Sequence, residues 1–227
     1  MRVGLVGPTY DQRSLPFDAQ RSINFFPVFD QSGKEVAALY GTPGLSEFTN
    51  VGAGPIRGEF ISGNGRMFAV SGSGLYEIDS AGTGTLLGSL STSSGRVTMA
   101  EGTTQLAICD GQTLYSLIYS SDTFAIVTDA DLPASVGYVT NIDGYFVVNE
   151  NDTGKFYISA LNDVTNWDAL DYATAENTPD TLLAVVNAVG QLWVFGERTT
   201  EIWANTGASN FPFSRLAGLA MPVCALA

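Results

Sequence analysis

A short pattern that occurs four times constrains this chain more than any other feature. Each copy opens with a run of apolar residues of strand length, and the starts of successive runs lie 39, 39 and 47 residues apart. The opening runs are Met67–Val70, Leu106–Cys109, Tyr145–Val148 and Leu192–Phe195. The companion runs that follow them are Leu75–Ile78, Leu114–Leu117, Phe156–Ser159 and Glu201–Trp203. A repeat of this length constrains the fold before any local detail is considered.

Repeats of about 40–50 residues with several short strands are typical of β-propeller blades. A single blade cannot bury both of its faces, so neighbouring blades must stack on it. The sequence therefore predicts an all-β chain, a β-propeller of four-stranded blades that can belong to a larger propeller, preceded by an extended strap. The predicted segments are the strap at 1–55, blades at 56–92, 93–132, 133–180 and 181–220, and the start of a further blade at 221–227.

Glycine and proline separate the apolar runs, since 25 Gly and 9 Pro fall mostly between them. Asn64-Gly65, Asp110-Gly111 and Asp143-Gly144 are typical of hairpin turns. The longest step between repeats comes from residues 162–179, which we interpret as a loop inserted in the third blade. Loops of repeat proteins commonly carry function.

Several kinds of chemistry lack the residues that they need. The chain has no histidine, which removes Ser-His and Cys-His nucleophilic catalysis. Cys109 and Cys224 are its two cysteines, and we interpret them as buried thiols rather than as a disulfide or a zinc site. No run of residues approaches the ~18 apolar residues of a membrane span. We expect no catalytic residues, no cofactor, no metal and no membrane contact.

A carbohydrate-binding or glycoside-cleaving propeller is the alternative that the residues leave open, because pairs of carboxylates hydrolyse glycosides. The candidate pairs are Asp129 with Asp131, Glu150 with Asp152, and Asp168 with Asp171. All of them lie in turn-like stretches, where Asp more commonly caps the backbone. A general interaction module of a bacterial host is a third reading.

The formal net charge of -13 argues against a surface that grips nucleic acid, because neutralising phosphates takes clustered Lys and Arg. An acidic wall can still surround DNA without holding it. At physiological salt its repulsion of phosphates decays over about 8 Å.

Four stretches resemble the packaged-DNA stabilisation proteins of short-tailed bacteriophages, the tail-hub or head-closure family. They are Ala19–Pro27, Gly41–Leu45, Ser94–Gly102 and Gly190–Gly196 with Thr200–Trp203. Their order and spacing, rather than any single motif, carry the resemblance, which touches most of the chain.

The resemblance implies a structural role in the virion, at the tail or neck, after assembly in the host cytoplasm. It implies a homo-oligomeric ring, for which the family suggests six-fold symmetry, below the portal and its adaptor. Such a ring closes the head, retains the packaged DNA without sequence-specific binding, and carries the tail needle or spike proteins.

Within this reading, we expect the strap and the 162–179 stretch to contact other subunits or the adaptor, because aromatic and arginine side chains are favoured in interfaces. The alternative is that the strap packs on its own blade. The candidate interface residues are Arg21, Asn24, Phe25, Phe26, Phe29, Tyr40, Trp167 and Tyr172.

Overall fold

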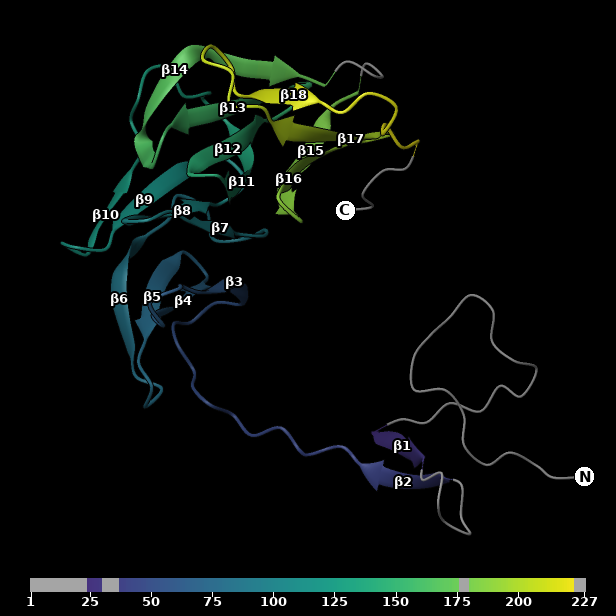
Figure 1. Ribbon diagram of the computed structural model, residues 1–227. Coiled ribbons are helices and arrows are strands. Elements are labelled where there is room, and N and C mark those ends of the chain that lie inside the picture. The colour runs from purple at the N-terminus through teal and green to yellow at the C-terminus, as the bar shows by residue number, and fades with distance from the viewer. Residues whose placement is uncertain (1–23, 30–36, 176–179, 223–227) are drawn as a thin grey trace, which may run out of the picture. The chain divides into compact units, whose positions relative to one another are not determined.

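The computed structural model describes residues 24–29, 37–175 and 180–222, and every regular element in this part is a β-strand (Figure 1). The chain divides into two compact units, residues 1–48 and 49–227. The first unit holds a two-stranded sheet, and the second holds four separate four-stranded antiparallel sheets. The predicted all-β class with blade-like units is therefore confirmed.

The first unit contains a hairpin in which β1 (Phe25–Phe29) pairs antiparallel with β2 (Ala37–Gly41). The sequence predicts one extended strap here, and the structure pairs it with a second strand. The pairing runs from Phe25 opposite Gly41 to Phe29 opposite Ala37, so the short apolar run before Gly41 satisfies the backbone groups of β1.

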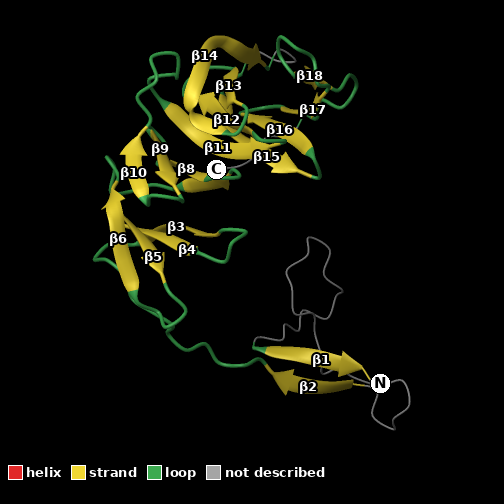
Figure 2. Ribbon diagram, turned by 60° about the vertical axis from the view of Figure 1, so that its left-hand side comes forward, coloured by secondary structure: helices red, strands yellow, loops and turns green. Residues whose placement is uncertain are grey.

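Each sheet of the second unit is a meander of four consecutive strands, the pattern of a propeller blade (Figures 1 and 2). Blade one consists of β3 (Ile56–Ile61), β4 (Met67–Ser71), β5 (Gly74–Ile78) and β6 (Gly84–Ser89). Blade two consists of β7 (Thr98–Glu101), β8 (Gln105–Cys109), β9 (Leu114–Ile118) and β10 (Thr123–Ile126). Blade three consists of β11 (Val136–Ile142), β12 (Tyr145–Glu150), β13 (Lys155–Ala160) and β14 (Asp163–Thr174). Blade four consists of β15 (Leu182–Ala188), β16 (Gln191–Gly196), β17 (Thr200–Asn205) and β18 (Phe213–Arg215).

The two middle strands of a blade are apolar on both faces. In β8 the four residues from Leu106 to Cys109 are all buried, as are the four from Leu114 to Leu117 in β9. The sequence of a strand that is covered on both sides is a continuous apolar run rather than an alternation of apolar and polar residues. This explains why the repeat is visible in the sequence through these strands and not through the fourth ones, which are largely exposed.

Apolar clusters fill the spaces between successive blades. Phe68 of blade one packs with Leu106 and Tyr115 of blade two, and all three side chains are 0% exposed. Between blades three and four, the rings of Phe156 and Trp203 meet edge to face with their centroids 5.1 Å apart. Burial of a large aromatic side chain stabilises by about 1.5–3 kcal/mol, so the blades depend on one another for their cores.

The first strands of the blades lie beside one another in chain order, β3 next to β7, β7 next to β11, and β11 next to β15 (Figure 1). In the part of the chain that the structure describes, apolar clusters join blades one and two, two and three, and three and four, and none joins blade four to blade one. Among these residues, blades one and four therefore each have a side without a neighbouring blade.

Residues before β3 cover the free side of blade one. Val51 is 7% exposed and packs with Ala69 and Ile78, and the Thr49 hydroxyl donates a hydrogen bond to the carbonyl of Gly82. The second unit consequently begins at Thr49, six residues before the strap was predicted to end.

The stretch interpreted as an inserted loop is instead mostly the outer strand of blade three. β14 pairs with β13 through Tyr157 opposite Tyr172 and Ser159 opposite Trp167, with register shifts between these pairs. The extra residues are absorbed by bulges in a 12-residue strand. The end of the predicted loop, 176–179, lies outside the described residues.

Only Met221 and Pro222 of the predicted further blade are described. Met221 forms an antiparallel bridge with Thr200, in which each backbone N–H donates to the other carbonyl at 2.9 Å. The remainder of the predicted fifth strand, residues 223–227, lies outside the described part.

A buried arginine joins blade one to blade two. The Arg57 side chain on β3 is 8% exposed, and its guanidinium donates five hydrogen bonds of 2.7–2.8 Å. Four go to the carbonyls of Gly72, Thr92, Ser94 and Gly95, and the fifth goes to the Thr92 hydroxyl. All the donors of the guanidinium are thereby satisfied, and most acceptors belong to the segment between the blades.

A carboxylate continues this network into blade two. The Thr92 hydroxyl donates to Asp110 at 2.9 Å, and the Tyr115 hydroxyl donates to the same oxygen at 3.1 Å. Burial alone would raise the pKa of Asp110, but the donors of Thr113, Thr92, Gln112 and Tyr115 lower it below its ordinary value. Asp110 therefore stays ionised, two hydrogen bonds away from the Arg57 charge.

We expect Arg57→Met to lower the free energy of unfolding by about 3 kcal/mol, because buried carbonyls lose their donors. Urea denaturation of the 227-residue chain measures the loss. Arg96→Met is the matched control, since Arg96 is exposed and lies over the Tyr138 ring, and its change is expected to stay below about 1 kcal/mol. Equal losses of stability for the two variants would contradict the conclusion that Arg57 joins blades one and two.

Cys109 supplies a second test of the core. Burial raises the pKa of its thiol to about 12, and the side chain is 0% exposed. In a Cys224→Ser variant at pH 8, we expect Ellman's reagent to leave the native chain unmodified and to react fully in 8 M urea, because the thiolate is the reactive form. Rapid modification of the native variant would contradict this packing.

Candidate assembly surfaces

The hairpin and the extended residues after it, 24–29 and 37–48, form a segment that we call the arm. Its apolar side chains are exposed: Phe25 by 48%, Phe26 by 44% and Tyr40 by 56%. Leu45 and Phe48, in the stretch without regular structure after β2, are exposed by 104% and 60%. Isolated apolar residues are common on surfaces, but a contiguous group of this kind marks an interaction site.

Both faces of the hairpin are apolar. Phe26 and Tyr40 stand opposite each other with their rings stacked at 6.0 Å, while Phe25 and Leu39 occupy the other face. A two-stranded hairpin alone is marginally stable in water. The hairpin is therefore a candidate for packing against another surface.

The other candidate interface residues of the strap provide less evidence for an interface. Asn24 has a φ of 59° and accepts a hydrogen bond from the Thr42 N–H at 2.9 Å, which fixes the open end of the hairpin. Phe29 lies at the end of β1, and its side chain is outside what the structure describes. Arg21 also lies outside the described residues.

The expectation of a surface position for Trp167 is wrong. Its indole is 4% exposed, lies in the cluster between blades two and three, and donates to the Val164 carbonyl at 2.7 Å. The side chain points inward because Trp167 lies in a strand, where alternate residues face the neighbouring blade.

Tyr172 has the exposure expected of an interface candidate, at 39%. Its ring lies 5.4 Å from that of Tyr157, and the Lys155 ammonium lies 5.0 Å from its centroid. These neighbours hold the ring flat on the outer strands of blade three. Because Tyr172 pairs with Tyr157 and Trp167 pairs with Ser159 on β13, both side chains lie on one face of blade three, with Trp167 buried and Tyr172 partly exposed.

Asp129 and Asp168, from two of the predicted carboxylate pairs, accept hydrogen bonds from backbone N–H groups, one of them from a residue 38 positions away. Asp129 accepts from the N–H groups of Asp131 and Trp167, and Asp168 accepts from that of Leu170. Burial, and then the charge of Asp168, raise the pKa of Asp171. Carboxylates placed this way cap turns of the chain.

A polar cavity of about 570 Å³ lies among the turns of blades one, two and three. Glu101 is the one carboxylate among its described lining residues, and it accepts hydrogen bonds from the Gly63 N–H at 2.7 Å and the Tyr119 hydroxyl at 3.1 Å. Glycoside hydrolysis ordinarily takes two facing carboxylates, so this cavity does not support it. Among the described residues, no group of three or more His, Cys, Asp and Glu side chains is arranged to hold a metal ion.

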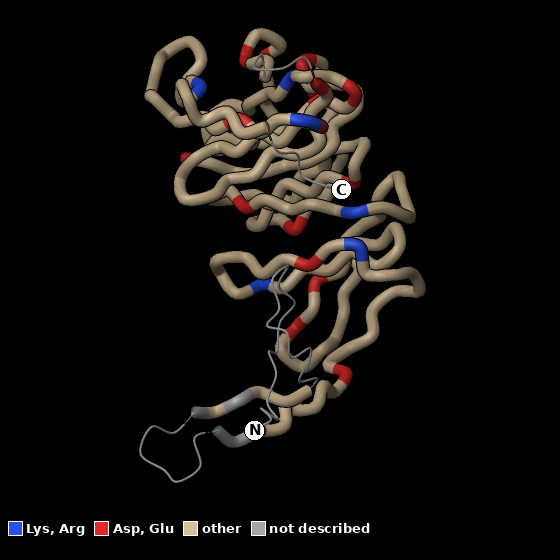
Figure 3. Tube along the Cα trace, turned by 90° about the vertical axis from the view of Figure 1, so that its right-hand side faces the viewer, with Lys and Arg blue, Asp and Glu red and all other residues tan. Residues whose placement is uncertain are grey.

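Negative charge is concentrated on the blades (Figure 3). Residues 49–227 contain 18 of the 23 acidic residues and 6 of the 10 basic ones, a formal charge of -12. Residues 1–48 carry the other five acidic and four basic residues, a charge of -1. Arg66 is paired with Glu77 and Asp122 at 2.6 Å, which reduces the exposed positive charge further.

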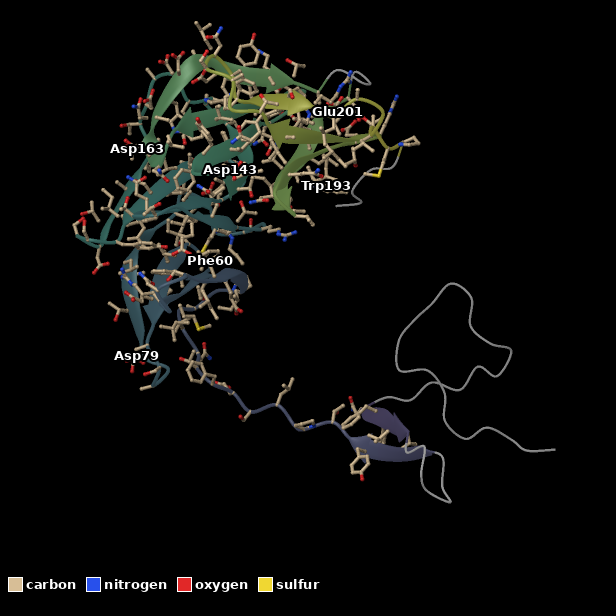
Figure 4. The ribbon with its side chains drawn as sticks, in the orientation of Figure 1. Phe60, Asp79, Asp143, Asp163, Trp193 and Glu201 are labelled. Atoms are coloured by element: carbon tan, nitrogen blue, oxygen red, sulfur yellow. The ribbon has the colours of Figure 1, made fainter. Side chains whose placement is uncertain are left out.

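Blade four has an apolar side that the sequence did not indicate as a surface. Leu192 and Val194 pack in the cluster between blades three and four, so the intervening Trp193, labelled in Figure 4, lies on the other face of β16. Trp193 stands opposite Val186 across the strand pair and stacks with Phe195 at 6.3 Å.

The turn between β15 and β16 adds a strained apolar residue to this region. Val189 has a φ of 55° and is 98% exposed, and Gly190 follows with a φ of 71°. Asp143 and Gly144 form the corresponding turn of blade three with φ values of 51° and 86°. Asp suits this left-handed conformation, whereas a β-branched residue is strained in it by about 1–2 kcal/mol.

A sequence profile of the family described as Bacteriophage P22 Gp10, beta-propeller, matches residues 1–227. No curated protein matches the chain. The structure of YCF48 bound to D1 peptide is similar at a TM-score of 0.51 and 12% identity, over 82% of this chain and 59% of that chain. The computationally designed Ika4 protein is similar at a TM-score of 0.50 and 11% identity, over 70% of this chain and 98% of that chain. The computationally designed Ika8 protein is similar at a TM-score of 0.47 and 15% identity, over 66% of this chain and 45% of that chain.

These structural similarities concern the fold alone. The chain spans about half the length of the Ika8 and YCF48 structures that it matches. In the described part of the chain, no helix is long and apolar enough to cross a bilayer.

The turn of blade four yields a stability test. We expect Val189→Asn to raise the free energy of unfolding by about 1 kcal/mol and the Tm by about 2–4 °C, because Asn adopts positive φ readily. The reciprocal change, Asp143→Val, places the same strain in blade three and is expected to lower both values. Differential scanning calorimetry measures both, and a lower Tm for Val189→Asn would contradict the strain.

Proposed function

Because the chain belongs to the family described as Bacteriophage P22 Gp10, beta-propeller, we propose that it forms a ring in the phage tail hub that closes the head after DNA packaging. The membership makes it a structural β-propeller protein of a bacteriophage, a component of the virion. In this function, the ring lies at the tail or neck, below the portal and its adaptor. It retains the packaged DNA and attaches the tail needle or spike proteins.

The exposed arm is the observation that supports assembly. Phe25, Phe26 and Tyr40 present aromatic area that a free monomer would keep in water, and the hairpin cannot bury both of its faces by itself. Aromatic side chains are enriched at the centres of interfaces, where they contribute most of the binding energy. A ring of identical subunits is an ordinary closed symmetry for such contacts.

The charge distribution supports enclosure of DNA without adhesion. The blades carry -12, and of their six basic residues Arg57 is buried among carbonyls and Arg66 is paired with carboxylates. Firm binding of DNA needs several basic groups on its phosphates. A wall built from these blades would repel the duplex within about 8 Å, which favours passage of the genome.

We expect the 227-residue chain to elute as one defined oligomer in light scattering behind a sizing column. The double variant Phe26→Ser/Tyr40→Ser should elute at the monomer mass of 24.0 kDa, because the interface loses its aromatic area. Leu86→Ser is the control, since Leu86 is 55% exposed on an outer strand and should leave the oligomer intact. A wild-type chain that stays monomeric at 100 µM would refute the ring.

A further inference from the structure

A second polar cavity, of about 400 Å³, lies beside the junction of blades two and three. It lies at the start of β7, whereas the cavity that contains Glu101 lies at the end of that strand. The segment that enters blade two, the β8–β9 turn and the start of β11 supply most of its described lining residues. Hydrogen bonds from Arg57 hold the entering segment and those from Asn151 hold the turn, so the cavity has a defined shape.

Arg96 is the exposed basic residue of this cavity. Its guanidinium lies 5.6 Å from the centroid of the Tyr138 ring, which limits the directions in which the side chain can point. In the part of the chain that the structure describes, Arg96 forms no ion pair, whereas Arg66 and Arg215 are each paired with carboxylates. A guanidinium held in this way presents its forked N–H groups for bidentate bonding to a carboxylate.

The charge around Arg96 is positive although the chain is strongly acidic. Asp110, the other charged residue among the described lining residues, is 3% exposed, and its oxygens already accept hydrogen bonds from the protein. Arg57 lies behind the same lining segment and donates to the carbonyls of Ser94 and Gly95. Two arginines and one carboxylate leave a formal charge of +1 beside the cavity, which favours an anionic group there.

The arm supplies an anionic group of matching chemistry. Within residues 24–29 and 37–48, the carboxylate of Glu47 is the one charged side chain. Glu47 is exposed and lies between the exposed side chains of Leu45 and Phe48, in the stretch without regular structure after β2. It has no ion-pair or hydrogen-bond partner among the described residues. The arm thus combines one unpaired carboxylate with exposed apolar side chains.

We propose that the arm of a second copy of this chain docks on the cavity beside blades two and three, where its Glu47 pairs with Arg96. Tyr138 and Leu183 provide apolar lining for the neighbouring side chains of the arm. Identical acidic subunits repel one another, and a pair between two groups of opposite charge offsets that repulsion at the contact. The contact is heterologous, so its repetition forms a ring when the rotation closes. This inference rests on the proposed ring and names one contact that forms it.

Charge reversal in the full chain tests the pair. We expect Arg96→Glu and Glu47→Arg each to raise the concentration for half-assembly, measured by light scattering, at least tenfold, because like charges then face each other. The double variant Glu47→Arg/Arg96→Glu should return that concentration to within about threefold of the wild-type value. The control is Glu47→Arg/Arg198→Glu, which has the same net charge. Arg198 is exposed but lies outside this cavity, so this control should show no recovery.

A mixture of the two single variants identifies the occupant of the cavity. When Glu47→Arg chains are mixed with Arg96→Glu chains, each altered arm can meet an altered cavity on the other kind of chain. Each unaltered arm can likewise meet an unaltered cavity, so an alternating assembly satisfies every pair. We expect the mixture to assemble as the wild type does. Arms that dock on the blades of their own chain would leave the mixture as weakly assembled as either variant alone.

The outcomes distinguish this inference from the proposed function. An oligomer that depends on Phe26 and Tyr40, but tolerates Arg96→Glu and Glu47→Arg, would overturn the docking contact and leave the ring standing. Single variants that assemble weakly and are not restored in the double variant would overturn the pairing of these two groups. A double variant that recovers while the mixture does not would overturn the second copy as the occupant. A wild-type chain that remains monomeric would remove the ring and this contact together.

Discussion

The interior of this protein depends on the requirement that both faces of every blade be covered. The middle strands β8 and β9 are buried on both sides, and β4 and β12 are nearly so. Such a sheet cannot cover both of its faces by itself, so neighbouring blades stabilise it. The clusters around Phe68, Phe146 and Phe156 meet this requirement at the three junctions between blades.

Polar side chains fix the blades at the same junctions, an arginine at the first and asparagines at the other two. Arg57 bonds to the segment that enters blade two, Asn151 donates to Gly111 and Ser135 between blades two and three, and Asn149 donates to Leu182 at the entry to blade four. Hydrophobic packing permits a blade to rotate or slide on its neighbour, whereas directed hydrogen bonds select one orientation. The curvature of the row of blades therefore depends on a few buried donors.

The repeat was predictable from sequence because strands that are buried on both faces appear as uninterrupted apolar runs. The fourth strands were harder to predict, since β6 and β10 are mostly exposed and β14 is interrupted by bulges. Trp167 illustrates the difficulty: a tryptophan between polar residues suggests a surface loop until the register of β14 is known. For Val189, a Val-Gly pair where Asp-Gly stands in blade three was a visible signal, but its meaning requires the φ angle.

The arm and the hydrogen bonds of Arg57 between blades one and two were predictable to different degrees. Aromatic residues near the start of the chain predict an interface segment, and the structure shows Phe25, Phe26 and Tyr40 exposed. Arg57 gave no comparable signal, because its five acceptors lie between residues 72 and 95 and come together only when blades one and two stack. Contacts between residues that are distant in sequence cannot be deduced from periodicity, however regular it is.

The order of strands within the blades also has a consequence for synthesis. Each sheet is built from four consecutive strands, and no described sheet borrows a strand from a distant part of the chain. Loop closure between such neighbours costs little entropy, so local pairing is fast. As the chain leaves the ribosome, each blade can form once its own residues have emerged and then serve as the template for the next. Ribosomal pausing between blades would consequently leave an exposed apolar face in the nascent chain, the point at which a chaperone would be needed.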